Sequence, residues 1–135
     1  MKEKIHHIGI AVKDLKKSLQ QWKKSFSIKS GEMEVIRERG VKIATLHFDT
    51  GPVIELIEAI GGDSPIQKFL EKKGEGVHHF CLKTEDLDQK VKELKKKGMR
   101  FVQENPVAGA GGSRIIFIHP DNLNGVLIEL KEEKT

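Results

Sequence analysis

Short runs of alternating apolar and polar residues, separated by segments of helical periodicity, set out the elements along this chain. Residues 7–12 are typical of a strand, and Asp14 follows as a helix cap. Apolar residues then recur at helical spacing: Leu15, Leu19, Trp22 and Phe26. Residues 32–48 predict two strands turned at Arg39–Gly40, and residues 53–59 predict a third strand.

The same order starts again after a short linking helix. Residues 61–74 predict that helix, with Asp63 or Ser64 as its cap. A strand at residues 77–83 is followed by a second amphipathic helix, which begins after Asp86. Three more strands are expected at residues 100–103, 114–119 and 126–130.

Equivalent residues in the two halves are separated by a nearly constant interval, which indicates an internal repeat. The pairs at this interval are His7 with His79, Asp14 with Asp86, Gly51 with Gly125 and Glu55 with Glu129. A duplicated βαβββ module is the simplest explanation. The predicted fold class is therefore α+β, as one domain over residues 1–135: module 1 (1–62), the linking helix (63–75) and module 2 (76–135).

The repeat delivers two histidines and two glutamates to one side of the predicted sheets. Alternate residues of a strand face opposite sides, so Ile10 faces the helices while His7 faces away from them. The same count places Glu55 in the first module, and His79 and Glu129 in the second, on the face without helices. Each module therefore contributes one imidazole and one carboxylate.

These four side chains predict a metal site if the two sheets curve together. A buried carboxylate is costly unless it is paired or bound to a metal, and one divalent cation would satisfy all four groups. Mixed nitrogen and oxygen ligands suit a six-coordinate ion, with Co²⁺ as the first choice and Mn²⁺, Ni²⁺ or Zn²⁺ as alternatives. Taken singly, each residue has a plainer interpretation as a core or surface side chain; only the paired register favours a metal.

Composition narrows the class of protein. The net charge is +4, from 24 Lys and Arg against 20 Asp and Glu, without a dense basic block, and aromatic residues make up only 5%. This pattern predicts no nucleic-acid partner. No apolar run approaches the ~18 residues of a membrane span. A single cysteine, Cys81, excludes an internal disulfide and favours a reducing compartment, so we expect a cytoplasmic protein.

Several longer motifs resemble the methylmalonyl-CoA epimerase family of the vicinal-oxygen-chelate (glyoxalase/bleomycin-resistance) superfamily. They are HIGIAV, GDSPIQKFLEKKGEGVHHFCL, GAGGSRIIFIHP and GVLIELKE, and the resemblance covers nearly the whole chain. It implies paired βαβββ modules that form a metal-holding cup in a homodimer. It also implies four metal ligands, His7, Glu55, His79 and Glu129, with glutamine in place of Glu55 in some members.

The resemblance implies a small-molecule partner, a CoA thioester, and interconversion of the two C2 epimers of methylmalonyl-CoA. One base would remove the C2 proton and an acid on the other face would return one. Glu129 is the catalytic residue expected for one of these roles. Some members carry a second glutamate on the strand that here spans residues 41–48, where this chain has Lys42 and Ile43 instead. The remaining candidates are Glu34, Glu38 and Asp49 at a shifted register, Glu55, or a metal-bound water.

A glycine-rich segment and two basic residues are candidates for binding substrate. The segment runs GAGG over residues 109–112, where backbone N–H groups at Gly111 and Gly112 can approach a phosphate or carboxylate. A flexible turn without a ligand explains the same glycines. Arg114 and His119 face opposite sides of their strand, and either can line the mouth of the cup.

Three other functions share parts of this pattern. A glyoxalase I-type lactoylglutathione lyase uses much the same four ligands. An Fe(II) extradiol dioxygenase needs an open fourth position, which Glu55 fills here. A non-catalytic small-molecule-binding protein of the same superfamily is the third alternative, and the retention of all four ligands counts against it.

Overall fold

The computed structural model describes residues 2–134, apart from the side chain of Ser30. Within these residues the order is strand, helix, three strands, linking helix, strand, helix and three strands, as the repeat predicted. The helices are α1 (Leu15–Ser25), α2 (Pro65–Lys73) and α3 (Leu87–Lys96). The strands are β1 (Lys4–Ala11), β2 (Ser30–Ile36), β3 (Val41–His47), β4 (Val53–Ala59), β5 (Gly76–Thr84), β6 (Val107–Ala108), β7 (Arg114–Ile118) and β8 (Ile128–Glu132). Short 3-10 turns are η1 (Arg37–Arg39), η2 (Ala110–Gly112) and η3 (Pro120–Asn122).

The chain divides into two compact units, which are residues 7–78 and residues 2–6 with 79–134. In the first unit the strands are ordered β2-β3-β4-β1, and in the second β5-β8-β7-β6. In each unit the first strand of the module pairs in parallel with the last, while the other neighbours pair antiparallel. The two modules therefore share one topology.

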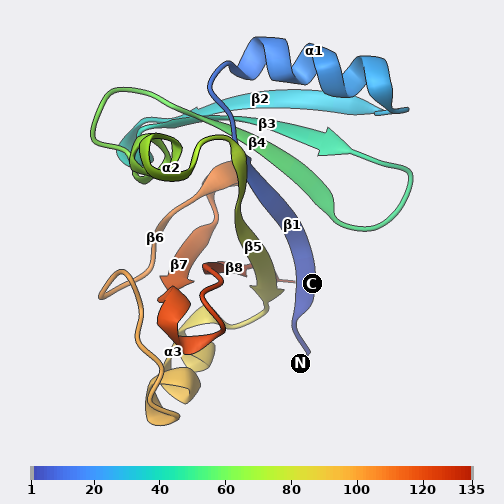
Figure 1. The fold of residues 1–135 in the computed structure, drawn as a ribbon. Coiled ribbons are helices and arrows are strands. Elements are labelled where there is room, and N and C mark those ends of the chain that lie inside the picture. Colours follow the sequence, from blue (N-terminus) through green and yellow to red (C-terminus); the bar gives the residue numbers. More distant parts are fainter. Residues whose placement is uncertain (1, 135) are drawn as a thin grey trace. The chain divides into compact units, whose positions relative to one another are not determined.

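The core of the first unit lies between α1 and one face of the sheet, as Figure 1 shows for α1 over β2 to β4. Its buried cluster consists of Val12, Leu15, Ala44, Leu46 and Leu56. Ile10 and Ile54 pack against this cluster from β1 and β4. The predicted helix-facing residues of these two strands are thus confirmed, and they fix the orientation of the residues between them.

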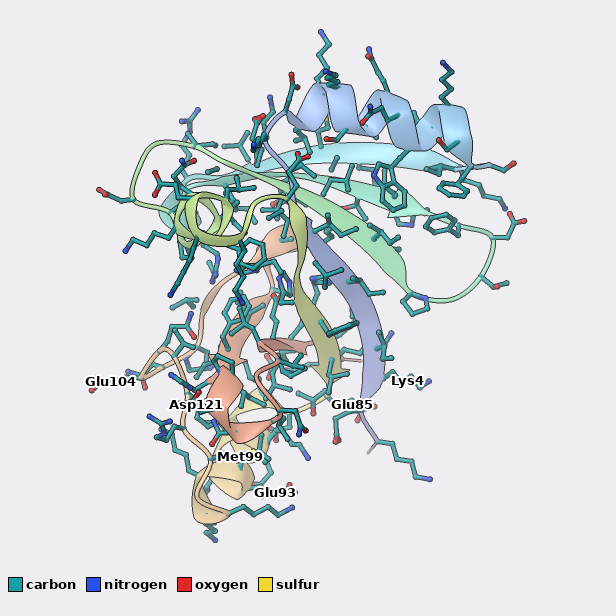
Figure 2. All side chains as sticks on the ribbon, viewed as in Figure 1. Lys4, Glu85, Glu93, Met99, Glu104 and Asp121 are labelled. Carbon is teal, nitrogen blue, oxygen red and sulfur yellow. The ribbon has the colours of Figure 1, made fainter. Side chains whose placement is uncertain are left out.

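The second unit repeats this arrangement with α3. Its buried cluster consists of Leu87, Val91, Leu94, Ile116, Ile118 and Leu130. Leu82 and Ile128 pack against it from β5 and β8, and Met99 from the segment after α3 (Figure 2). The helix-facing alternation of β5 and β8 is confirmed as well.

Two strand predictions for the second module were wrong: the first of its last three strands is β6 at residues 107–108 and not residues 100–103, and the last strand begins later than expected. The predicted strand at residues 100–103 forms only an isolated bridge from Phe101 to Ile118. The ladder is interrupted because the Phe117 N–H donates to the side-chain Oε1 of Gln103 (2.9 Å) instead of a backbone carbonyl. The last strand begins at Ile128 rather than at residue 126, since the Val126 N–H closes a turn onto Leu123 O at 3.0 Å.

The linking helix α2 begins as predicted after one of its two candidate caps. The Gln67 N–H donates to Ser64 Oγ at 3.1 Å, so Ser64 and not Asp63 is the cap. The helix ends at Gly74, whose φ of 79° favours glycine. No helix described between residues 2 and 134 has the length and apolar character needed to cross a membrane.

A second glutamate in the last strand of each module holds the module's helix. The Leu15 N–H of α1 donates to Glu58 Oε1, and the Leu87 N–H of α3 donates to Glu132 Oε2, each at 3.0 Å. A carboxylate at a helix N-terminus satisfies a backbone donor and complements the helix dipole. Glu58 and Glu132 are related by the same interval as Glu55 and Glu129. The run IELxE therefore sends one glutamate to each face.

Replacing Glu58 or Glu132 by alanine is expected to lower the free energy of unfolding by about 1 kcal/mol each, because the first N–H of a helix loses its carboxylate acceptor while the cap, Asp14 or Asp86, stays in place. The midpoint of thermal unfolding should fall by roughly 4 °C per substitution. Glu71→Ala is the matched control, since the one contact of the Glu71 carboxylate with another described residue is an exposed one with Gln67. Equal melting temperatures for Glu58→Ala and the control would contradict this role.

Candidate metal-binding and catalytic site

His7 and Glu55 form a buried pair in the first unit. Gly9 of β1 lies opposite Glu55 of β4 in the parallel register, so His7, two positions before Gly9, shares a face with Glu55. Their side chains meet, with Nδ1 of His7 3.3 Å from Oε2 of Glu55. Relative exposures of 1% and 4% show that water does not solvate either residue freely.

His79 and Glu129 form the equivalent pair in the second unit. Cys81 of β5 lies opposite Glu129 of β8, which places His79 on the same face as Glu129. Nε2 of His79 is 2.8 Å from Oε1 of Glu129, and both residues are buried. The ring of Phe117 meets the imidazole of His79 edge-on, at 5.4 Å between centroids. This contact restricts the orientation of the imidazole.

The donor chemistry of each pair fits a divalent cation. Nitrogen and oxygen ligands lie ~2.0–2.2 Å from such ions, so two ligands at right angles are roughly 3 Å apart. The observed separations of 3.3 and 2.8 Å bracket this value. A buried imidazole and carboxylate at this distance also stabilise each other directly. Each pair is therefore suited to a metal ion but does not require one.

Two lysines lie beyond the His79–Glu129 pair on its strands, Lys83 in β5 and Lys131 in β8. Lys83 Nζ donates to Glu133 Oε1 at 2.9 Å, and this hydrogen bond holds the pKa of Glu133 below its ordinary value. Burial opposes that shift, while the charges of Lys83, His6 and Lys131 reinforce it. Glu133 is therefore already neutralised by Lys83.

Two of the four predicted substrate contacts are engaged by protein groups. Arg114 donates to both carboxylate oxygens of Asp88 at 2.9 and 3.2 Å, and this bond lowers the pKa of Asp88. Arg114 thus lies on the α3 side of β7, away from the face that carries Glu129. His119 Nδ1 accepts from the Asp121 N–H at 3.1 Å and so caps η3.

The other two predicted contacts, Gly111 and Gly112, form the turn η2 immediately before β7. Their φ values of 68° and 73° lie in the left-handed region that favours glycine. The turn is closed by the Gly109 N–H, which donates to Ser113 O at 2.9 Å. The substrate-binding role of Gly111, Gly112, Arg114 and His119 stays a prediction.

The three acidic candidates for a second acid or base lie in different settings. Asp49 pairs with Lys29 at 3.4 Å in an exposed position. Glu34 lies opposite Ile43 in the register, which places it on the same face as Glu55 but at the edge strand β2. Glu38 is exposed on the turn η1, directly before the strand 41–48 on which sequence reasoning sought the residue.

Comparisons with known proteins agree with this architecture. A model of the Glyoxalase/Bleomycin resistance protein/Dioxygenase superfamily matches residues 6–117. The mitochondrial methylmalonyl-CoA epimerase of Bos taurus is 35% identical over 130 residues, which cover 96% of this chain and 74% of the bovine one. The ethylmalonyl-CoA/methylmalonyl-CoA epimerase of Cereibacter sphaeroides is 35% identical over 133 residues, covering 96% of this chain and 97% of the other.

A solved structure gives the same relationship in three dimensions. Streptomyces coelicolor methylmalonyl-CoA epimerase in complex with 2-nitronate-propionyl-CoA superposes with a TM-score of 0.91 at 35% identity, covering 98% of both chains. Three solved structures of that enzyme are of single variants. One replaces a glutamate by glutamine, the second replaces a glutamine further along the chain by alanine, and the third replaces a serine beyond that glutamine by threonine.

Topology, family model and relatives support one assignment. The predicted α+β fold with two βαβββ modules is confirmed by the observed element order and by these neighbours. The chain belongs to the methylmalonyl-CoA epimerase family of the glyoxalase/bleomycin resistance protein/dioxygenase superfamily.

Proposed function

We propose that this protein is a divalent-metal-dependent epimerase that interconverts the C2 epimers of methylmalonyl-CoA. The observation that carries the proposal is the repetition of a buried His–Glu pair at equivalent strand positions in both modules. Relatives named for their action on this thioester, at 35% identity over nearly the whole chain, support the choice of substrate.

We propose that His7, Glu55, His79 and Glu129 converge in a cup and hold one divalent cation together. Two imidazoles and two carboxylates suit Co²⁺, with Mn²⁺, Ni²⁺ and Zn²⁺ as alternatives. When bound, the cation would supply positive charge that polarises the thioester and carboxylate oxygens of the substrate and lowers the free energy of the enolate. The residues around it position the acyl group and move the proton.

Glu38 is the residue we propose as partner of Glu129 in proton transfer. In the Streptomyces coelicolor enzyme, the substituted glutamate precedes the substituted glutamine by the same interval by which Glu38 precedes Glu55 here. The substituted serine follows that glutamine by the interval at which Ala110 follows Glu55. Both spacings support one alignment, in which the second acid or base precedes β3 on the turn η1 instead of lying on the strand.

In this mechanism two carboxylates act on opposite faces of C2. One takes the C2 proton as a carboxylate, and the electron pair of the C–H bond moves into the enolate of the acyl group. The other, which is protonated at the start, gives its proton to C2 from the opposite face. The reaction therefore inverts C2 and leaves the two glutamates with exchanged protonation states, which the reverse reaction restores.

The same fold is compatible with a glyoxalase I-type lyase and with a non-catalytic binding protein. The test is to incubate the metal-loaded protein separately with one epimer of methylmalonyl-CoA and with the hemithioacetal of glutathione. The proposal predicts conversion of the single epimer to a mixture of both and no turnover of the hemithioacetal. Turnover of the hemithioacetal alone would assign the lyase activity, and turnover of neither would assign a binding role.

Glu55→Gln is expected to retain metal and to keep epimerisation within about 10-fold of the parent. An amide oxygen remains a ligand for the ion, and some family members use glutamine at this position. Metal content by inductively coupled plasma mass spectrometry and initial rates of epimerisation measure the two effects. Glu55→Leu is the matched comparison, because it removes the oxygen and should release metal. Full metal content in Glu55→Leu would exclude Glu55 as a ligand.

We further propose that the protein is a homodimer that acts in the cytoplasm. The family resemblance supports the dimer, and the single cysteine supports a reducing compartment. Light scattering coupled to size exclusion should give twice the chain mass of 15.2 kDa. A mass of one chain at micromolar concentration would exclude a stable dimer.

A further inference from the structure

A buried lysine lies two positions beyond Glu129 on the same strand. Lys131 and Glu129 belong to β8 and share one face of it, because alternate residues of a strand point to the same side. Only 9% of Lys131 is exposed. Lys131 and Ile57 are separated by the same interval as Glu129 and Glu55, so they occupy equivalent positions in the two modules. Ile57 is also buried, at 4% exposure. One module thus carries an apolar residue where the other carries a cation.

The ammonium of Lys131 has few partners among the residues that the structure describes. Lys131 Nζ donates to Ala110 O at 3.2 Å, while an ammonium has three donors. Within residues 2–134, no carboxylate forms an ion pair with Lys131. Glu133 feels its charge, but the carboxylate of Glu133 is hydrogen-bonded to Lys83. A buried cation without a counter-ion is costly, and the cost is offset if an anionic ligand binds there.

The contact with Ala110 attaches the lysine to the glycine-rich turn. Ala110 O also accepts from Ser113 Oγ at 2.8 Å, so the turn is closed around the carbonyl that Lys131 binds. A side chain at Gly109 would lie 2.7 Å from Ile115, so this turn packs directly against β7. The ammonium is thereby held between a fixed turn and the strand of Glu129.

We propose that Lys131 binds the free carboxylate of the acyl group and thereby selects carboxylated acyl-CoA thioesters over neutral ones. The inference rests on the proposed epimerase function, because that function places the reacting carbon beside Glu129. A malonyl-type acyl group carries its carboxylate on this same carbon. The ammonium of Lys131, two positions beyond Glu129 on the same face of β8, offers a compact positive charge for this carboxylate.

The test compares the affinities of two ligands that differ by one carboxylate. Dissociation constants for methylmalonyl-CoA and propionyl-CoA are measured by calorimetry on the metal-loaded parent, on Lys131→Met and on Lys131→Ile, the latter copying Ile57. The parent is expected to bind methylmalonyl-CoA more tightly than propionyl-CoA. Both variants should weaken methylmalonyl-CoA binding roughly 10- to 100-fold and leave propionyl-CoA binding unchanged.

Three controls separate recognition from a structural role. Lys131→Arg should keep most of the preference, because it retains the charge. Lys83→Met, which removes a lysine opposite Lys131 in the register, should not alter the preference. The melting temperature of Lys131→Met should equal or exceed that of the parent, since an unpaired buried charge is replaced by an apolar chain.

An unchanged preference in Lys131→Met would overturn the proposal, and so would an equal loss of affinity for both ligands, which indicates that Lys131 only supports the turn. Deuterium exchange at C2 by the parent is measured alongside. If the parent exchanges the proton but Lys131→Met keeps the preference, only this inference fails. If the parent neither binds nor exchanges methylmalonyl-CoA, the proposed function fails first.

Discussion

Glu38→Gln and Glu129→Gln are each expected to slow epimerisation by about 10²- to 10⁴-fold, the range that a general acid or base contributes. The amide that replaces each carboxylate can neither take nor return the proton. The remaining carboxylate still faces one side of C2. Each variant should therefore exchange the C2 proton of one epimer with solvent while inverting neither.

The two variants should exchange opposite epimers, because their remaining carboxylates lie on opposite faces. Separate incubation of each epimer in D₂O, followed by mass spectrometry and by separation of the epimers, measures exchange and inversion independently. Glu34→Gln is the matched control, because Glu34 lies in β2, directly before the turn of Glu38, and on the same sheet face as Glu55. This variant should epimerise the substrate as the parent does. Normal epimerisation by Glu38→Gln, or exchange of the same epimer by both variants, would contradict the two-carboxylate mechanism.

His79→Ala is expected to weaken metal binding by at least about 100-fold and to abolish epimerisation, because it removes a buried imidazole ligand. Changes at residues that merely support ligands already cost about 10- to 100-fold in affinity. Titration of the metal-free protein with Co²⁺, followed by its visible absorption, gives the affinity directly.

His78→Ala provides a control at the neighbouring position. The ring of His78 packs edge-on against Phe69 of α2 at 5.0 Å between centroids, so it belongs to the packing of the linking helix. This variant should bind Co²⁺ as the parent does. Retention of full affinity in His79→Ala, or an equal loss in both variants, would remove His79 from the ligand set.

The paired histidines and glutamates were predictable because each strand obeys a local rule. Alternate residues pack on the helix, and Ile10 or Ile128 therefore determines the side that the neighbouring His or Glu must take. The repeat then identified the equivalent strands without any three-dimensional information. The structure places each histidine beside the glutamate of its own module, while the role of these residues as ligands and the convergence of both pairs on one ion stay proposals.

Other features depend on contacts that no local rule predicts. The strand expected at residues 100–103 fails because one side chain, Gln103, takes a backbone position in the ladder. By alternation Glu58 and Glu132 fall on the helix-facing side of their strands, where the pattern predicts apolar residues. They instead bind the N–H groups of helices that lie far away in sequence. Such pairings need the tertiary structure.

The sequence offered Glu38 only as one of several candidates at a shifted register, and it did not single out Lys131. The second acid was sought on the strand after Gly40, while Glu38 stands on the turn before it. Lysine is usually a surface residue, so the sequence of the second module alone does not suggest that Lys131 is buried. The equivalent residue of the first module, Ile57, is apolar, which is the sequence signal of a buried position. Comparing the two modules position by position would have found this difference.

The measurement that tests the central claim most directly is deuterium incorporation at C2 of methylmalonyl-CoA. The Co²⁺-loaded protein is incubated with the thioester in D₂O, and the mass of the acyl group is followed with time, with and without a chelator. The proposed function predicts rapid incorporation of one deuterium at C2, accompanied by formation of the second epimer and lost on chelation. No protein-dependent incorporation by a fully metallated protein would contradict it.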